Sequence, residues 1–150
     1  WIYFLTNIHF EKPRLRGFFL YKLIICMKVS IIKPSSIIIM SWFYISVGIS
    51  HFTEPNWFLQ IVPPYLPYKL ELVYISGFLE IILGIMLIIP SIRSYAGWGL
   101  IMLLIAVYPA NIYLAQTNGA AMKTSSVVAW GRLPFQFLFI YLAFWHTQTK

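Results

Sequence analysis

The stretch KLELVYISGFLEIILGIMLIIP, residues 69–90, decides the fold because it is a long apolar run with one carboxylate near its middle. A helix of about 20 apolar residues matches a bilayer's hydrocarbon core, which is about 30 Å thick. The carboxylate of Glu80 is costly in lipid, so we expect it to face protein, water or a partner. Gly77 and Gly84 share its helical face, where small residues let a neighbouring backbone approach closely.

The composition of the whole chain is that of an integral membrane protein. Of its 150 residues, 60% are hydrophobic and 10% are charged, whereas ordinary soluble domains carry about 25% charged residues. The net charge of +7 is explained by basic residues that flank membrane spans and set topology, so we expect a lipid bilayer and no nucleic acid as partner. The single cysteine, Cys26, excludes a disulfide framework and a cysteine-based metal cluster within the chain.

Residues 1–26 differ from the rest of the chain. They mix aromatic and charged residues without a clear period, whereas the sequence from Met27 onward has a short basic head followed by an apolar run. We therefore expect residues 1–26 to be a non-native upstream segment. The alternative is an interfacial tail with a basic face. Residues 27–150 are expected to form one domain.

The apolar runs of that domain predict an all-α fold, a bundle of four transmembrane helices at about residues 34–52, 70–90, 95–115 and 130–146. Proline near the start of the first helix is acceptable, because its missing N–H would have no partner there. One face of this helix is expected to pack against its neighbours. That face carries Ser41, Tyr44, Gly48 and His51.

The connections between the helices are expected to lie at the membrane surface. Four prolines between Pro55 and Pro67 cannot continue a helix, and the aromatic side chains of this loop are typical of the interface. These aromatic residues are Trp57, Phe58, Tyr65 and Tyr68. Pro109 is expected to kink the third helix and to free a carbonyl one turn earlier. Residues 125–132 are expected to be an interfacial segment that leads into the fourth helix.

The distribution of basic residues predicts the topology. The side that holds both termini carries Lys28, Lys33, Arg93 and Lys150, and the other side carries Lys69, Lys123 and Arg132 offset by Glu54 and Glu71. The positive-inside rule then places both termini in the cytoplasm. With this topology, polar residues from all four helices collect in a cup that opens to the extracytoplasmic side. Glu80 forms its floor, and its rim consists of His51, Glu71, Asn111, Arg132 and Gln136.

Each member of this cup also has a structural interpretation. Glu80 and Arg132 would form an ion pair that fixes helix register. Asn111 and Gln136 would satisfy backbone groups freed by prolines, and His51 would be a solvated interfacial histidine. We expect no metal site, because no His and carboxylate residues stand at a ligand spacing within one span. A haem with two histidine ligands is disfavoured because the other candidate, His146, is expected at the opposite membrane face.

Four sequence blocks resemble the DoxX-like family of small four-helix membrane proteins. They are VPPYLP at 62–67, SGFLEIILG at 76–84, PANIY at 109–113 and RLPFQ at 132–136, within a match over about residues 45–145. The family's motif glutamate falls on Glu80. The resemblance implies a bacterial-type inner (plasma) membrane protein associated with quinone or sulfur redox chemistry, with quinone as the candidate cofactor and a second subunit as redox partner.

Three functional hypotheses remain open at this point. In the first, the chain is a redox-associated subunit that binds a quinone or small substrate, with Glu80 as a catalytic proton relay and Asn111, Arg132 and Gln136 as hydrogen-bond donors. In the second, it is a non-enzymatic structural or assembly subunit whose Glu–Arg cluster is a helix clamp. In the third, it is a small-molecule carrier, which with four spans requires a homo-oligomer. Whether the chain is an enzyme stays open.

Overall fold

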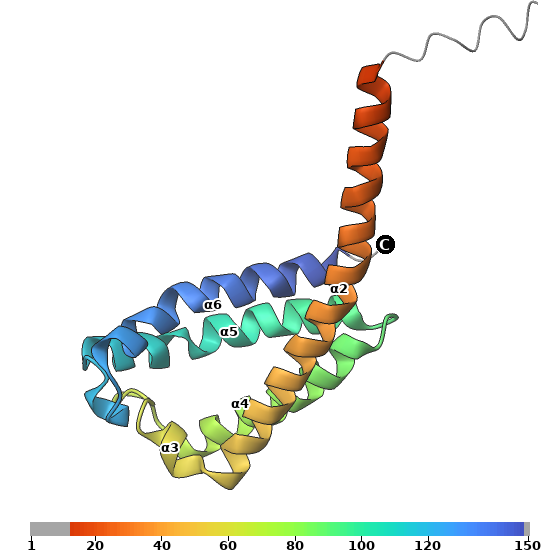
Figure 1. The fold of residues 1–150 in the computed structure, drawn as a ribbon. Coiled ribbons are helices and arrows are strands. Elements are labelled where there is room, and N and C mark those ends of the chain that lie inside the picture. The colour runs from red at the N-terminus through yellow and green to blue at the C-terminus, as the bar shows by residue number, and fades with distance from the viewer. Residues whose placement is uncertain (1–12, 149–150) are drawn as a thin grey trace, which may run out of the picture. The chain divides into compact units, whose positions relative to one another are not determined.

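The computed structural model describes residues 13–148, and in this range it consists of helices and connecting turns without strands. The elements are α2 (Pro13–Thr53), α3 (Pro55–Leu59), α4 (Lys69–Ile88), α5 (Arg93–Gln116), the 3₁₀ helix η2 (Ala120–Met122) and α6 (Ser126–Thr147) (Figure 1). The predicted all-α class is therefore confirmed. Residues 1–12, which belong to the predicted upstream segment 1–26, lie outside the described residues.

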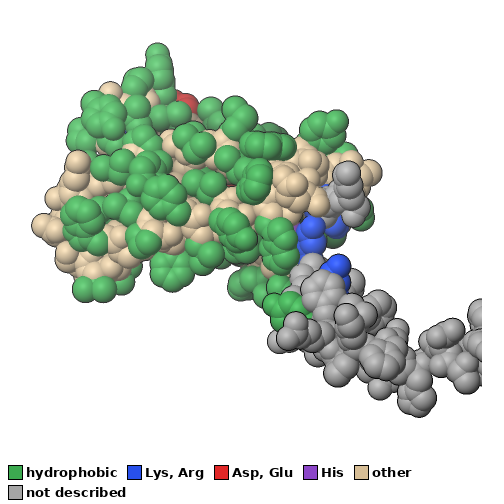
Figure 2. Space-filling model, turned by 90° about the horizontal axis from the view of Figure 1, so that it is seen from above, with side chains coloured by type: hydrophobic (Ala, Val, Ile, Leu, Met, Phe, Trp, Pro, Cys, Tyr) green, Lys and Arg blue, Asp and Glu red, His purple; other side chains and the backbone are tan. Residues whose placement is uncertain are grey.

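Four of these helices are long and apolar enough to cross a bilayer, which confirms the predicted number of spans for the described part of the chain. The candidate spans are Ile32–Thr53, Lys69–Ile88, Arg93–Gln116 and Ser126–Thr147. Large apolar side chains are exposed on all four, and they dominate the face of the protein seen in Figure 2. Such an apolar surface suits lipid. The helical backbone suits it as well, because a helix satisfies its own backbone hydrogen bonds without water.

The chain divides into two units, residues 1–36 and 37–150, and α2 belongs to both. The described backbone of the first unit, from residue 13 onward, is helical. This corrects the expectation that the first helix begins at Pro34, because Pro34 stands inside α2. Serine hydroxyls can re-satisfy backbone carbonyls near a proline in a membrane helix, and Ser36 Oγ donates a hydrogen bond to the carbonyl of Lys33 at 2.9 Å.

In the second unit, α2 and α4 pack closely at glycine residues, as their offsets predicted. A Cβ atom added at Gly48 would lie 2.7 Å from the carbonyl oxygen of Gly77, and one added at Gly77 would lie 2.5 Å from the Cβ of His51. One added at Gly84 would lie 3.2 Å from the carbonyl oxygen of Ser41. The predicted packing face of the first span is buried along its whole length.

Helices α5 and α6 lie side by side (Figure 1). They approach closely at Gly97, where an added Cβ would lie 2.9 Å from the carbonyl oxygen of Ala143. Around this contact lies a core that we call the closed end of the bundle. It consists of Ile37, Met40, Tyr44, Leu87, Ala96, Leu100, Ile101 and Ala143. A smaller cluster of Ile61, Leu114 and Ala129 lies toward the other end, near α3 and η2, which we call the cavity end.

The connections at the cavity end differ from the expected loops. The proline-rich segment contains the short helix α3, with Pro55 in its first turn, where a missing N–H costs nothing. Helix α6 begins at Ser126, inside the segment expected to be interfacial, because the Ser125 side chain caps it by accepting a hydrogen bond from Val128 N at 3.3 Å. Trp57, Tyr65 and Tyr68 are exposed, as an interfacial loop requires.

Candidate functional site: a polar cavity between the helices

A cavity of about 210 Å³ lies between the two hydrophobic clusters and is lined by all four spans and the α3 segment. Five of the six residues predicted for the cup line it, namely His51, Glu80, Asn111, Arg132 and Gln136. The other walls are apolar and rich in aromatic rings, being formed by Phe43, Val47, Phe58, Ile61, Leu104, Val107, Ala110, Phe135 and Phe139. The sequence therefore predicted the polar lining, whereas single phenylalanines carried no signal that set them apart from lipid-facing ones.

The sixth predicted residue, Glu71, does not belong to this site. It lies in the first turn of α4 and is exposed. Glu71 and Glu80 are nine residues apart, which is two and a half turns at 3.6 residues per turn, so they lie on opposite sides of the helix. Its charge at the start of α4 suits the positive end of the helix dipole. Glu71 therefore does not line this cavity, and its part in ligand binding stays a prediction.

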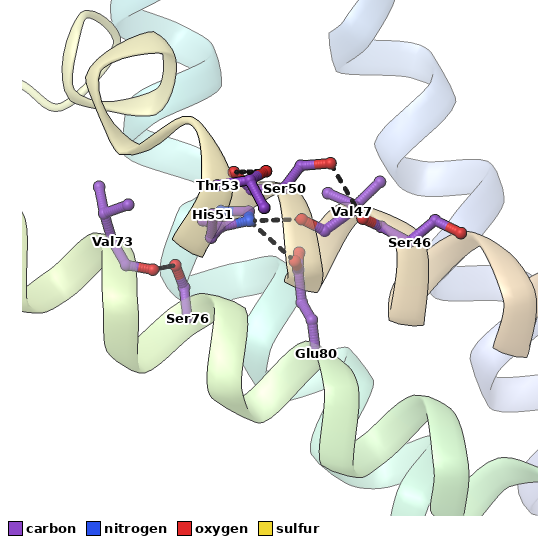
Figure 3. Close-up of polar contacts among 8 residues, drawn as sticks. All are labelled: Ser46, Val47, Ser50, His51, Thr53, Val73, Ser76 and Glu80. Atoms are coloured by element: carbon purple, nitrogen blue, oxygen red, sulfur yellow. Dashed lines mark hydrogen bonds and ion pairs between the residues drawn. The ribbon is translucent and has the colours of Figure 1, made fainter.

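The side chain beside the Glu80 carboxyl group is that of His51, which projects from the end of α2 toward the middle of α4 (Figure 3). His51 Nδ1 lies 3.3 Å from Glu80 Oε2 and 2.8 Å from the carbonyl oxygen of Val47. Because a carbonyl can only accept, Nδ1 carries the hydrogen, and Nε2 holds the lone pair when the ring is neutral. His51 is only 7% exposed, so it is not a solvated interfacial histidine.

Phe58 covers the histidine from the α3 segment. Its ring stacks on the His51 ring with centroids 3.6 Å apart and planes inclined by 21°. Phe58 is buried, which corrects its assignment to the interfacial aromatic residues. The sequence did hold a signal for the His51–Glu80 pair, because both residues stand on faces that carry small residues, Gly48 on α2 and Gly77 on α4. Two faces that are both expected to pack closely can be expected to pack on each other.

Arg132 does not pair with Glu80, which contradicts the ion pair expected of the helix clamp. Its Nη1 donates a hydrogen bond to Met122 Sδ at 3.4 Å, and its guanidinium carbon lies 6.0 Å from the ring centroid of Trp57. A second cavity, of about 390 Å³, is lined by Trp57, Met122, Lys123, Thr124, Val128 and Arg132. Arg132 thus lines both cavities. A thioether and an indole face leave most of its five N–H donors for a ligand.

Asn111 and Gln136 connect α5 to α6. Asn111 Nδ2 donates to Gln136 Oε1 at 2.8 Å, and Gln136 Nε2 donates to the carbonyl of Leu104. The carbonyl that Pro109 frees directly is that of Ile105, four residues earlier. Gln136 binds the carbonyl of the preceding residue, Leu104. We expected Asn111 and Gln136 to satisfy backbone groups freed by prolines. Gln136 does so in part, because it binds a carbonyl next to the freed one, whereas Asn111 binds and orients Gln136.

Together these side chains provide an acid–base pair, a cation and two amides inside apolar walls. Hydrogen bonds are stronger in such a low-dielectric environment than in water. An apolar cavity of about 150 Å³ is known to hold benzene, so this volume admits one substituted ring. The arrangement is chemically suited to a planar ligand that carries hydrogen-bond acceptors.

The fold and this cavity define the chain as a four-helix integral membrane protein. It belongs to the family described as Domain of unknown function (DUF8561), whose model matches residues 40–147. The matched range contains all five polar residues of the cavity. No curated protein matches the chain, and no solved structure matches it.

Proposed function

We propose that the chain is a DoxX-like membrane subunit that binds the head group of a quinone in the cavity and exchanges protons with it through Glu80. The observation that carries this proposal is the convergence of an acid–base pair and three hydrogen-bonding side chains in a cavity with aromatic walls. The residues on which the DoxX resemblance depends, Glu80, Asn111 and Arg132, all line this one cavity.

The walls of the cavity fit a planar ring. Phe43 and Phe139 are stacked with centroids 5.1 Å apart and planes inclined by 14°, and Phe58 lies flat on His51. Aromatic side chains favour offset-stacked or edge-on contacts with another ring. The volume accommodates one ring, so an isoprenoid tail would leave between the helices toward lipid, where exposed apolar side chains surround the protein.

The polar side chains fit the two oxygens of such a ring. Arg132 and Asn111 are donors that reach the cavity from α6 and α5, and each would hold a carbonyl oxygen. Glu80 would hold the proton that passes to or from the nearer oxygen, and the His51 N–H beside it would stabilise the carboxylate that results. A bound quinone would take up two electrons, from a partner subunit, together with two protons.

This function has a test in which the chain supplies its own control. We would purify the full chain from its native membrane in mild detergent and extract bound small molecules for mass spectrometry. The wild-type protein and Glu71→Gln should retain stoichiometric quinone, whereas Glu80→Gln should lose it. Glu71 is a suitable control because it is an exposed carboxylate on the same helix.

A structural or assembly subunit is the second candidate. The contacts of Glu80 with His51 and of Gln136 with Leu104 tie α2 to α4 and α5 to α6, so the polar groups also hold helices together. A wild-type protein that carries no quinone but brings down a second polypeptide would favour this candidate and contradict the first.

A further inference from the structure

The second cavity, which we call the basic cavity, is lined by two cations and by no carboxylate. Its volume is about 390 Å³, and its lining consists of Trp57, Met122, Lys123, Thr124, Val128 and Arg132. Of the acidic residues of the chain, Glu54, Glu71 and Glu80 fall within residues 13–148, and none of them lines this cavity. Within the same residues, neither Lys123 nor Arg132 has an ion-pair partner. The two positive charges of the cavity are therefore left for an anion from outside the chain.

Arg132 is held at the wall of the basic cavity by two uncharged side chains. Its Nη1 donates to Met122 Sδ at 3.4 Å, and its guanidinium carbon lies 6.0 Å from the ring centroid of Trp57. These contacts orient the guanidinium group without neutralising it. A guanidinium group carries five N–H donors in a planar fork that matches the oxygens of a phosphate group. The donors that remain therefore suit a tetrahedral oxyanion.

Lys123 belongs to a closed turn over residues 119–124. The carbonyl of Gly119 accepts hydrogen bonds from Met122 N at 3.2 Å and from Thr124 N at 3.0 Å. Gly119 has a φ of 81°, and a Cβ atom added there would clash with the carbonyl oxygen of Thr124. Lys123 itself has a φ of 50°, in the left-handed region that few residues other than glycine adopt. Such strained positions occur often at ligand sites, and here the turn fixes the backbone that carries the lysine.

The start of α6 adds further features that suit an anion attached to an apolar group. Thr124 and Val128 lie on either side of the cap residue Ser125, and both line the basic cavity. The N-terminus of a helix is the positive end of its dipole and favours phosphate, and the Thr124 hydroxyl is an additional donor. Val128 and Trp57 are exposed, so an acyl or glycerol group beside the anion would meet apolar surface.

We propose that the basic cavity binds a phosphate group between Lys123 and Arg132, either as the head group of an anionic phospholipid or as free phosphate. Its volume lies within the range of about 300–1,000 Å³ that is usual for small-molecule sites. Basic residues near the membrane surface attract anionic head groups. Arg132 also lines the quinone cavity, whereas Lys123 lines only the basic cavity. The proposal therefore goes beyond the quinone function and stands without it.

The wild-type protein allows a first test that needs no variant. The full chain in mild detergent would be mixed with equal amounts of phosphatidylglycerol and of diacylglycerol with the same acyl chains, and native mass spectrometry would count the bound lipids. Severalfold preference for phosphatidylglycerol would identify a lipid head group as the ligand. A higher melting temperature in sodium phosphate than in sodium chloride of equal ionic strength would identify free phosphate. Equal binding of the two lipids without a rise in phosphate would overturn the proposal.

Lysine variants test whether the phosphate group binds in the basic cavity. Lys123→Gln should reduce the response of the wild type severalfold, whereas Lys123→Arg, which keeps the charge, should retain it. Lys69→Gln is the matched control, because Lys69 begins α4 and does not line the basic cavity. Equal losses in Lys123→Gln and Lys69→Gln would indicate attraction by diffuse surface charge, and an unchanged response in Lys123→Gln would remove the lysine from the site. Either result would contradict the proposal.

Discussion

The closed end and the cavity end of the bundle are built from the same helices but differ in the side chains that these helices bring together. At the closed end, Gly97 lets α5 approach the backbone of α6 closely, and Leu87 of α4 and Leu100 of α5 are fully buried in the core. At the cavity end the same helices carry amide, carboxyl, imidazole and guanidinium groups, and the cavity lies among these groups. The comparison suggests that the closed end supplies most of the stability, whereas the cavity end supplies the chemistry.

The largest expected effect comes from removing a side chain at the closed end. Leu100→Ala should lower the free energy of unfolding by about 2–5 kcal/mol, because it deletes a fully buried side chain and leaves a cavity. Met102→Ala is the control on the same helix, since Met102 is 72% exposed. Denaturant titration in mixed micelles measures both. Equal losses would contradict the view that the closed end holds the bundle together.

Adding a side chain at the closed end should have a somewhat smaller effect. A Cβ atom at Gly97 would lie 2.7 Å from Thr147 Cγ2 and 2.9 Å from Ala143 O, so Gly97→Leu should cost about 1–3 kcal/mol through overpacking. Gly131→Leu is a matched control on α6, because a Cβ there would meet nothing within 4 Å. The same titration should show that Gly131→Leu stays near wild type.

At the cavity end, the amide contacts should contribute a similar or smaller amount. Gln136→Leu leaves the Leu104 carbonyl and the Asn111 side chain without their partner, which should cost about 1–3 kcal/mol. A double-mutant cycle with Asn111→Ala should show coupling, because the two residues are in direct contact. Strictly additive losses would mean that the Asn111–Gln136 hydrogen bond contributes nothing.

The smallest effect on stability is expected at Arg132. Its contacts with a thioether and an indole ring are weak, so Arg132→Gln should leave the free energy of unfolding within about 1 kcal/mol of wild type. The same variant should release bound quinone during purification, because Arg132 would hold one of its oxygens. Full quinone retention by a stable Arg132→Gln protein would remove Arg132 from the proposed site.

The helices and the packing faces of α2 and α4 could be predicted from the sequence because they depend on local patterns. The length of apolar runs sets the spans, and the offsets of Gly48, Gly77 and Gly84 set the faces that meet. The polar lining could be predicted too, except for Glu71, since helix periodicity turns that residue away from Glu80. The topology relative to the membrane stays a prediction.

The pairing of side chains within the cavity could not be predicted in the same way. Charge alone matched Glu80 with Arg132, whereas the close approach of two helix backbones places His51 beside Glu80. Phe58 became part of the site because α3 folds back over His51, and a proline-rich loop gives no sign of that. Apart from the glycine-bearing faces of α2 and α4, the sequence therefore gives no sign of which side chains become partners, because tertiary contacts decide this.

The most direct test of the central claim is to locate a bound quinone in the protein. A photoreactive quinone analogue, added to the full chain in native-like membranes and activated by light, would be mapped by peptide mass spectrometry. The account predicts labelling at Phe58 and Phe139 on the cavity wall, lost with excess unlabelled quinone. Labelling confined to Phe78 and Phe137, which are exposed and outside the cavity, would show that the quinone only dissolves in the surrounding lipid and would contradict the claim.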